Sequence, residues 1–302
     1  MNPADEQMEA LIRQFKAMGM TDEMIAMYRQ QMEFAQKFAP ELQKEAMDLA
    51  SGMQEMMQGM ANGEIELIEF SPDTTLTPAQ KKAVACGADF SVLRDIFVDD
   101  LTTGIGEANC THILSEWWGI DSPEEMLETI ESLTKEGHRR RYSELIRIFK
   151  AGGAQEIIAK GGREVPDEDS ASEEEIQAVE DANRGAENMS NLCEAVELFT
   201  ENGLIKDGVL PDLIAWDFVR IINNCRAGFD AGYLDRAEAL AHIETAAQKV
   251  YATYGSWKEV SVAYQFGRYI WGGGEQYGML KECMDILLTD ERSPWRTIPW
   301  KA

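Results

Sequence analysis

Two apolar helical patterns in the last third of the chain contain charged residues, and this combination constrains the fold most. After Pro211 and Asp212, apolar residues recur every three or four positions through 213–229. This is the period of an amphipathic helix and not the alternation of a strand. A second pattern starts near Ser256, with aromatic residues at every seventh position up to Trp271. Charged side chains are seldom fully buried without a partner, so the two helices must satisfy their own charges.

The charged residues of these two helices are spaced so that they can meet. Asp217 and Arg220 are three residues apart, so they share a helix face and can form an ion pair. Arg268 follows Tyr264 by four residues, and its guanidinium could stack on that ring or reach a carboxylate. Gly267 would let another backbone come close. We predict that the two helices pack together, with Arg220 and Arg268 as buried or half-buried cations and Asp217 as their partner.

Two interpretations of this group stay open. One is a structural ion-pair network inside an aromatic core, and the other is a polar pocket that binds or converts a ligand. For an enzyme, the catalytic candidates are Asp217 as base or orienter, Arg220 and Arg268 as anion holders, and Tyr264 or Tyr233 as acid. The candidates for binding are Trp216, Tyr233, Trp257, Trp271, His138 and Arg139.

A dense basic cluster, residues 138–141, stands where a further helix is predicted to begin. Cations at a helix N-terminus oppose the helix dipole unless an anion is bound there. The cluster is therefore either a carboxylate or phosphate site, or a set of partners for the protein's own abundant acids.

The charge balance restricts the classes of partner. The chain has 302 residues with 54 acidic and 28 basic side chains, a formal net charge of −26. Nucleic acid and anionic membrane surfaces attract basic proteins, so we expect neither as a partner. A basic protein partner is plausible because a negative field speeds its encounter. The alternative is that the acidity serves only solubility.

The cysteine pattern and the known motifs restrict cofactors and location. Five cysteines are scattered without a C-x-x-C spacing, which argues against a disulfide framework or a zinc site and fits a reducing cytosol. The first residues lack the features of a signal peptide, and no apolar run reaches transmembrane length. The triple glycine at 272–274 lacks the Lys-Ser/Thr of a P-loop. We expect a cytoplasmic protein without metal or cofactor.

Helical spacing through most of the chain predicts a mainly α protein with at most one short strand pair. We predict a single multi-helix domain over 63–302, with a glycine-rich and then acidic loop or insert near 151–175. Residues 64–70 alternate and would form one strand or an extended linker. Residues 1–62 hold 12 of the 16 methionines and predict a helical extension. Methionine-rich surfaces adapt to partners, so this extension could dock on the body, bind a partner or form a homo-oligomer.

Several short motifs together resemble a known family. They are Trp118-Gly119-Ile120, Gly137-His138-Arg139, Ala215-Trp216-Asp217 with Arg220, Gly232-Tyr233-Leu234, Ser256-Trp257, Tyr264 with Gly267-Arg268 and Trp271, and Ser293-Pro294-Trp295 with Pro299-Trp300. This set, over roughly 76–302, resembles the bacterial domain-of-unknown-function family 1266. The resemblance implies a compact, mainly helical domain. It implies no activity and no catalytic residues.

Three functions follow as hypotheses. The first, which we favour, is an acidic cytosolic protein that binds a basic partner, and one form of this hypothesis is an immunity-type inhibitor of a basic toxin or effector. Some such bacterial families serve in toxin and immunity systems, and the immunity role of this protein is a conjecture based on them. The second is an enzyme of unknown reaction with a pocket around Asp217, Arg220 and Arg268. The third is an oligomeric scaffold that assembles through residues 1–62.

Overall fold

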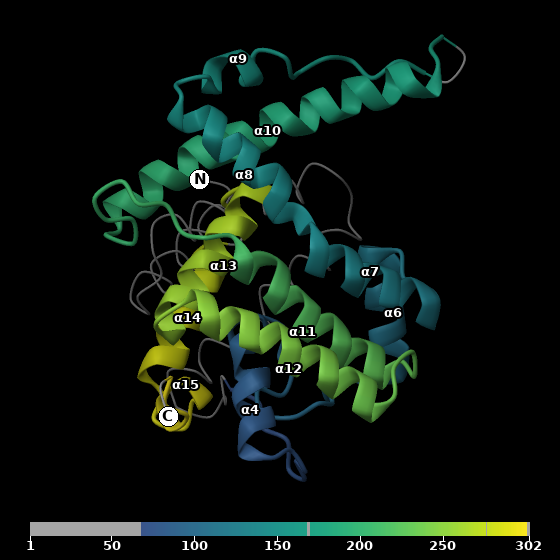
Figure 1. The fold of residues 1–302 in the computed structure, drawn as a ribbon, viewed down its shortest axis with the longest axis vertical. Helices are drawn as coiled ribbons and strands as arrows, with labels where there is room; N and C mark the ends of the chain where they lie inside the picture. The colour runs from purple at the N-terminus through teal and green to yellow at the C-terminus, as the bar shows by residue number, and fades with distance from the viewer. Residues whose placement is uncertain (1–67, 168–169, 276, 301–302) are drawn as a thin grey trace, which may run out of the picture. The chain divides into compact units, whose positions relative to one another are not determined.

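The computed structural model describes residues 68–167, 170–275 and 277–300 (Figure 1). Within these residues all regular secondary structure is helical, apart from one isolated bridge between Lys206 and Val209. The prediction of a mainly α protein is confirmed. The predicted methionine-rich extension, residues 1–62, lies outside the described residues.

The helices keep the labels of Figure 1, which begin at α4. Their bounds are α4 (Pro78–Val84), the 3-10 helix η1 (Ala85–Gly87), α5 (Ala88–Leu93), α6 (Glu107–Trp118), α7 (Pro123–Lys135), α8 (Gly137–Lys150), α9 (Ala154–Ile158), α10 (Glu173–Glu201), α11 (Ile214–Asp230), α12 (Arg236–Thr253), α13 (Trp257–Gly272), α14 (Tyr277–Thr289) and α15 (Pro294–Thr297). No described helix is long and apolar enough to span a membrane.

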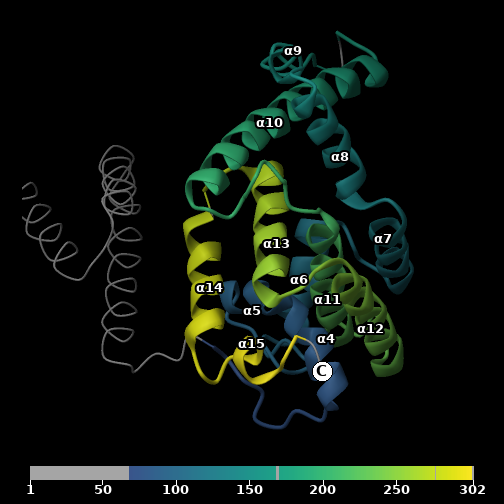
Figure 2. The same ribbon diagram turned by 60° about the vertical axis from the view of Figure 1, so that its left-hand side comes forward.

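Helix α11 is the central element. Every residue from Ala215 to Gly228 is buried, because the helix packs against α12, α13, α6, α7, α8 and η1. Gly232, with a φ of +76°, ends it in the left-handed conformation that glycine adopts without strain. The chain then reverses, and α12 runs back beside α11 (Figures 1 and 2). Figure 2 shows α13 between α14 and α11.

The close approach predicted at Gly267 occurs where α13 packs against α11. A Cβ atom added to Gly267 would lie 2.5 Å from Cβ of Trp216 and 2.7 Å from its Cγ. The neighbour is therefore a side chain and not another backbone. The missing methyl group lets the indole of Trp216 lie directly against α13, with its ring centroid 5.5 Å from that of Tyr264.

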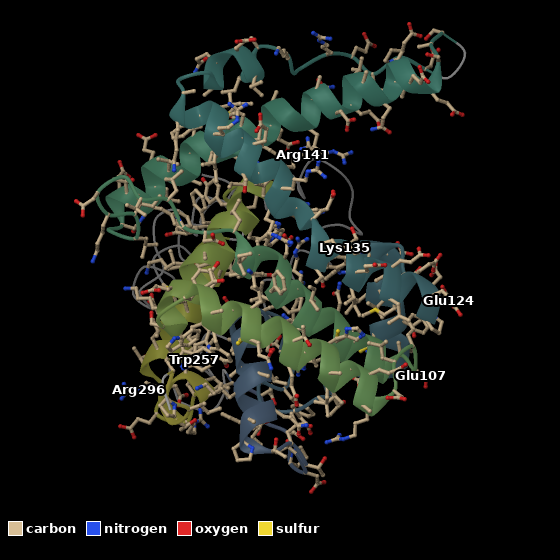
Figure 3. All side chains as sticks on the ribbon, viewed as in Figure 1. Glu107, Glu124, Lys135, Arg141, Trp257 and Arg296 are labelled. Carbon is tan, nitrogen blue, oxygen red and sulfur yellow. The ribbon has the colours of Figure 1, made fainter. Side chains whose placement is uncertain are left out.

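The two tryptophans of the C-terminal tail pack on the core. The ring of Trp295 is stacked on that of Trp257 at 6.0 Å, and Trp300 meets Trp257 edge-on at 4.8 Å. Trp295 Nε1 also donates a hydrogen bond to the carbonyl of Ala85 at 2.8 Å. Figure 3 labels Trp257 in this cluster. Within the tail, residues 294–297 make the single turn α15.

The helical segment that begins at Pro78 includes the 3-10 helix η1 and ends at Leu93, and residues 96–103 form a loop. Arg226 of α11 holds this loop, because its fully buried guanidinium donates to Ser91 Oγ at 2.9 Å and to the carbonyls of Phe97 and Thr102. A buried cation needs such acceptors, and a helix would have used these carbonyls internally.

Two other segments differ in detail from the sequence-based expectation. Residues 68–70 form no strand, and the carbonyl of Glu69 instead accepts a hydrogen bond from the Val98 N–H at 2.9 Å. The loop or insert expected near 151–175 includes the short helix α9. The start of α10 also lies in this range, with a capping box between Ser172 and Glu175.

We predict that Gly267→Ala destabilises the protein by about 1–3 kcal/mol, because the added methyl group overlaps Trp216. Gly185→Ala on α10 is the matched control, since no atom lies within 4 Å of the Cβ position there. That change should be neutral or stabilising by up to about 1 kcal/mol. Urea unfolding of both variants measures the difference, and equal free energies of unfolding would contradict the prediction.

Candidate functional site

A cavity of about 850 Å³ lies beside α11. Helices α5, α6 and α13, the start of α8 and the loop after α5 complete its wall. Aromatic rings and guanidinium groups dominate the described residues that line it, with Glu116 as the one acid among them. The lining includes Phe90, Arg94, Thr103, Cys110, Glu116, Trp117, Trp118, His138, Trp216, Arg220, Asn223, Asn224, Tyr264, Arg268 and Trp271.

Asp217 lies behind this wall and joins α11 to α8. Its Oδ1 accepts from Arg220 Nη2 at 2.5 Å and from the backbone N–H of His138 at 3.0 Å. Its Oδ2 accepts from the backbone N–H of Arg139 at 3.1 Å and from Arg139 Nη1 at 2.9 Å. The anion at the N-terminus of α8 is therefore the chain's own carboxylate, which offsets the basic cluster and the helix dipole there.

This arrangement makes the Asp217 group a structural ion-pair network. The carboxylate is 0% exposed and both oxygens are held by cations and backbone N–H groups. Four contacts thus occupy this carboxylate, which disfavours the role of base in the enzyme hypothesis and is compatible with the alternative role of orienter. Gly137 makes the contact possible, because with φ +57° its Cα leaves the space that Asp217 Oδ2 fills.

Arg220 connects the network to the cavity. Its guanidinium lies 4.0 Å from the ring centroid of Trp216 and 5.3 Å from that of Trp118. Its Nη1 is 3.2 Å from His138 Nδ1. Arginine has only donors, so this nitrogen of His138 accepts and the neutral ring carries its proton on Nε2. Loss of hydration, and then the charge of Arg220, lower the pKa of His138 to about 4.

Two guanidinium groups stack on half-exposed tryptophans of the cavity wall. Arg268 lies 4.5 Å from the ring centroid of Trp271, and Arg94 lies 4.5 Å from that of Trp117. Arg268 was predicted to stack on Tyr264 or to reach a carboxylate, and the ring on which its guanidinium stacks is that of Trp271. The side chain of Trp117 is 54% exposed, and the guanidinium of Arg94 lies over its ring.

Tyr264 forms part of the aromatic wall. Burial raises the pKa of its phenol well above the usual value, so the hydroxyl stays protonated at neutral pH. It can donate a hydrogen bond but is a poor general acid or base, because a catalytic pKa should lie near the working pH.

The predicted candidates therefore separate into two groups. Six of them line the cavity, namely His138, Trp216, Arg220, Tyr264, Arg268 and Trp271. The others lie elsewhere: Arg139 and Asp217 behind the wall, Trp257 against the C-terminal tail, and Tyr233 after α11. Sequence reasoning missed Arg94, Asn223 and Asn224. Only Asn224 carried a signal, through its spacing from Asp217 and Arg220.

No group of three or more His, Cys, Asp or Glu side chains that could hold a metal ion occurs in the described parts of the chain. The chemistry available at the cavity is thus that of guanidinium groups, aromatic rings and carboxamides. Such groups can bind anions, planar rings and polar ring edges.

Asp217→Ala should lower the free energy of unfolding by about 3–5 kcal/mol, because it leaves the buried Arg220 and the N-terminus of α8 without their anion. Glu144→Ala is the matched control, since Glu144 also pairs with an arginine three residues later but is 54% exposed. Exposed pairs contribute little, so we expect no measurable loss there. Urea unfolding decides, and equal losses in the two variants would refute a structural role for Asp217.

The burial of Asp89, which precedes the cavity residue Phe90, predicts how the stability of the fold depends on pH. It is fully buried and accepts from Ser261 Oγ at 3.0 Å. Loss of hydration raises its pKa from 3.8 to about 6. The folded state therefore retains this proton at pH values where the unfolded state has lost it, so stability falls as pH rises from about 4 to about 6.

The difference from the ordinary pKa of Asp89 corresponds to about 3 kcal/mol. Asp89→Asn keeps the shape without the charge, so its stability should not show this fall. The measurement is urea unfolding of both proteins between pH 4 and pH 7. Parallel profiles would show that Asp89 does not titrate in this range.

Comparison with known proteins identifies a family. Residues 113–300, more than half of the chain, match the family described as "Protein of unknown function (DUF1266)". Residues 76–112, which the motif resemblance was expected to include, lie outside the match. No curated protein and no solved structure matches the chain. The match includes all helices from α7 to α15. The chain therefore belongs to this family of unknown function, DUF1266.

Proposed function

We propose that this protein binds a small organic anion with a planar aromatic part in the cavity beside α11. The observation that carries the proposal is the lining of that cavity. Guanidinium groups stack on indole rings there, and Glu116 is the one acid among the described lining residues.

The local charge of the cavity is opposite to that of the chain. Arg94, Arg220 and Arg268 contribute three positive charges and Glu116 one negative charge, whereas the whole chain carries −26. Part of the charge of Arg220 is balanced by Asp217, but Arg94 has no ion pair with a described residue. The chain has many acidic side chains that could pair with arginines, yet the wall of this cavity is basic and aromatic. Recognition of an aromatic anion needs a wall of this kind.

The geometry supports binding better than acid–base catalysis. Asp217 has both oxygens engaged, Tyr264 keeps its proton, and Nδ1 of His138 faces a guanidinium. Stacking on Trp117 holds the guanidinium of Arg94 in place while its N–H edge can still donate to an anion, which lowers the ordering cost of binding.

The other hypotheses stay predictions. A basic protein partner, including an immunity role, rests on the net charge alone, and assembly through residues 1–62 concerns a segment outside the described residues. A cytoplasmic location is part of our proposal and agrees with the five free cysteines.

A suitable probe is 2-naphthyl phosphate, compared with 2-naphthol and with inorganic phosphate by titration calorimetry on the full-length protein. We expect the aromatic phosphate to bind at least about tenfold more tightly than either fragment, because only it uses both rings and cations. Arg94→Gln should weaken this binding about tenfold, which corresponds to about 1.4 kcal/mol.

Arg147→Gln is the control, because Arg147 is an exposed arginine of α8 that pairs with Glu144 outside the cavity. Its affinity for the probe should equal that of the wild type. The proposal fails if the probe does not bind at millimolar concentration, or if the two arginine variants bind it equally well.

A further inference from the structure

A second hollow adjoins the cavity beside α11. It has a volume of about 360 Å³ and lies where α8, α10 and the end of α13 meet. His138 and Trp271 line both the cavity and this second hollow, so the two spaces meet at these side chains. Arg141 of α8 and Arg184 of α10 also line the second hollow. A ligand that lies against Trp271 in the cavity can therefore extend toward two further arginines.

Arg141 is an exception among the arginines of α8. Three of the four arginines in this helix form ion pairs, namely Arg139 with Asp217, Arg140 with Glu136 and Arg147 with Glu144. Arg141 forms neither an ion pair nor a hydrogen bond with any described residue, although it is partly buried. Figure 3 shows it on α8, close to where that helix packs against α10.

Arg184 has acids nearby but does not pair with them. Asp181 and Glu187 stand three residues before and after it on α10, a spacing at which helical residues of opposite charge can pair. Arg184 nevertheless forms no ion pair with a described residue. In a chain with 54 acidic side chains, two accessible arginines that line one hollow without such a partner are available to an external anion.

His138 connects these two arginines with the cavity. Its Nδ1 faces Arg220, so Nε2 carries the proton of the ring and can donate to an anion. Loss of hydration and the charge of Arg220 lower its pKa most, and the charges of Arg141 and Arg184 lower it further. Arg141 follows His138 by three residues, which is a rise of about 4.5 Å along the helix. Donors thus continue from the cavity into the second hollow.

We propose that the ligand of the cavity carries a short chain of anionic groups, and that the far end of this chain binds Arg141 and Arg184 in the second hollow. This inference rests on the proposed function. The aromatic part lies against the indole rings of the cavity, and the anionic chain passes His138. A short polyphosphate on an aromatic group has this form, and guanidinium groups bind phosphate oxygens in pairs.

The net charge of the chain makes this proposal specific. A protein of charge −26 repels a ligand more strongly when that ligand gains negative charge. A longer anionic chain therefore improves affinity only where local cations receive it. The second hollow has two such cations, and Glu187 is the one acid among the described residues that line it.

The test compares three probes on the full-length protein by titration calorimetry, in a buffer without divalent cations. They are 2-naphthyl phosphate, 2-naphthyl triphosphate and inorganic triphosphate. We expect 2-naphthyl triphosphate to bind at least about tenfold more tightly than either of the others, because only it contacts both the aromatic wall and the arginines of the second hollow.

Arg141→Gln and Arg184→Gln should each reduce the preference for 2-naphthyl triphosphate over 2-naphthyl phosphate about fivefold, since each removes a charged donor to the end of the chain. The affinity for 2-naphthyl phosphate should stay within about twofold, because that probe does not reach the second hollow. Arg147→Gln is the matched control, since it removes an exposed arginine of the same helix outside both spaces. It should change neither affinity.

The outcomes separate the two proposals. If 2-naphthyl phosphate binds through Arg94 but the triphosphate is not preferred, or if the preference survives in both the Arg141 and the Arg184 variant, this inference is overturned and the proposed function stands. If inorganic triphosphate binds as tightly as 2-naphthyl triphosphate, or if none of the three probes binds, both are overturned.

Discussion

The carboxylate of Asp217 is the interaction on which the site depends. It is fully buried and holds two arginine side chains together with the first N–H groups of α8. A buried carboxylate is tolerated only with such partners. By binding α8 to α11, it also places His138 and the guanidinium of Arg220 in the cavity wall. Arg220 thus belongs both to the structural ion pair with Asp217 and to the lining of the cavity.

A second buried guanidinium shapes the other side of the cavity. Arg226 donates hydrogen bonds to the carbonyls of Phe97 and Thr102, while Asp230 accepts one from the Thr103 N–H at 2.7 Å. These bonds hold the loop between α5 and α6 against α11. The loop stops α5 early, so that Arg94 reaches the ring of Trp117 on α6. Charged residues of α11 therefore position α8 and the loop after α5, while Trp216, Asn223 and Asn224 of α11 line the cavity directly.

Much of the site was predictable because it depends on spacing within a helix. Asp217 and Arg220 are one turn apart, and any helix would bring them together. The glycine at 267 likewise indicated a close packing partner for α13. Arg94 and Trp117 were not predictable, because their contact depends on where the helix after Pro78 ends. The loop that follows this end is held by Arg226, more than 100 residues later in the chain, and no local propensity indicates this contact.

The sequence by itself determined the helical fold, the central pair of helices and the ion pair within α11, because periodicity and neighbour spacing act over one or two turns. Only the tertiary structure decided which anion occupies the N-terminus of α8 and which ring supports Arg268. These outcomes depend on contacts between residues far apart in the chain. Burial then makes each contact matter, since a charge or carboxamide removed from water must find its partner within the fold or in a ligand.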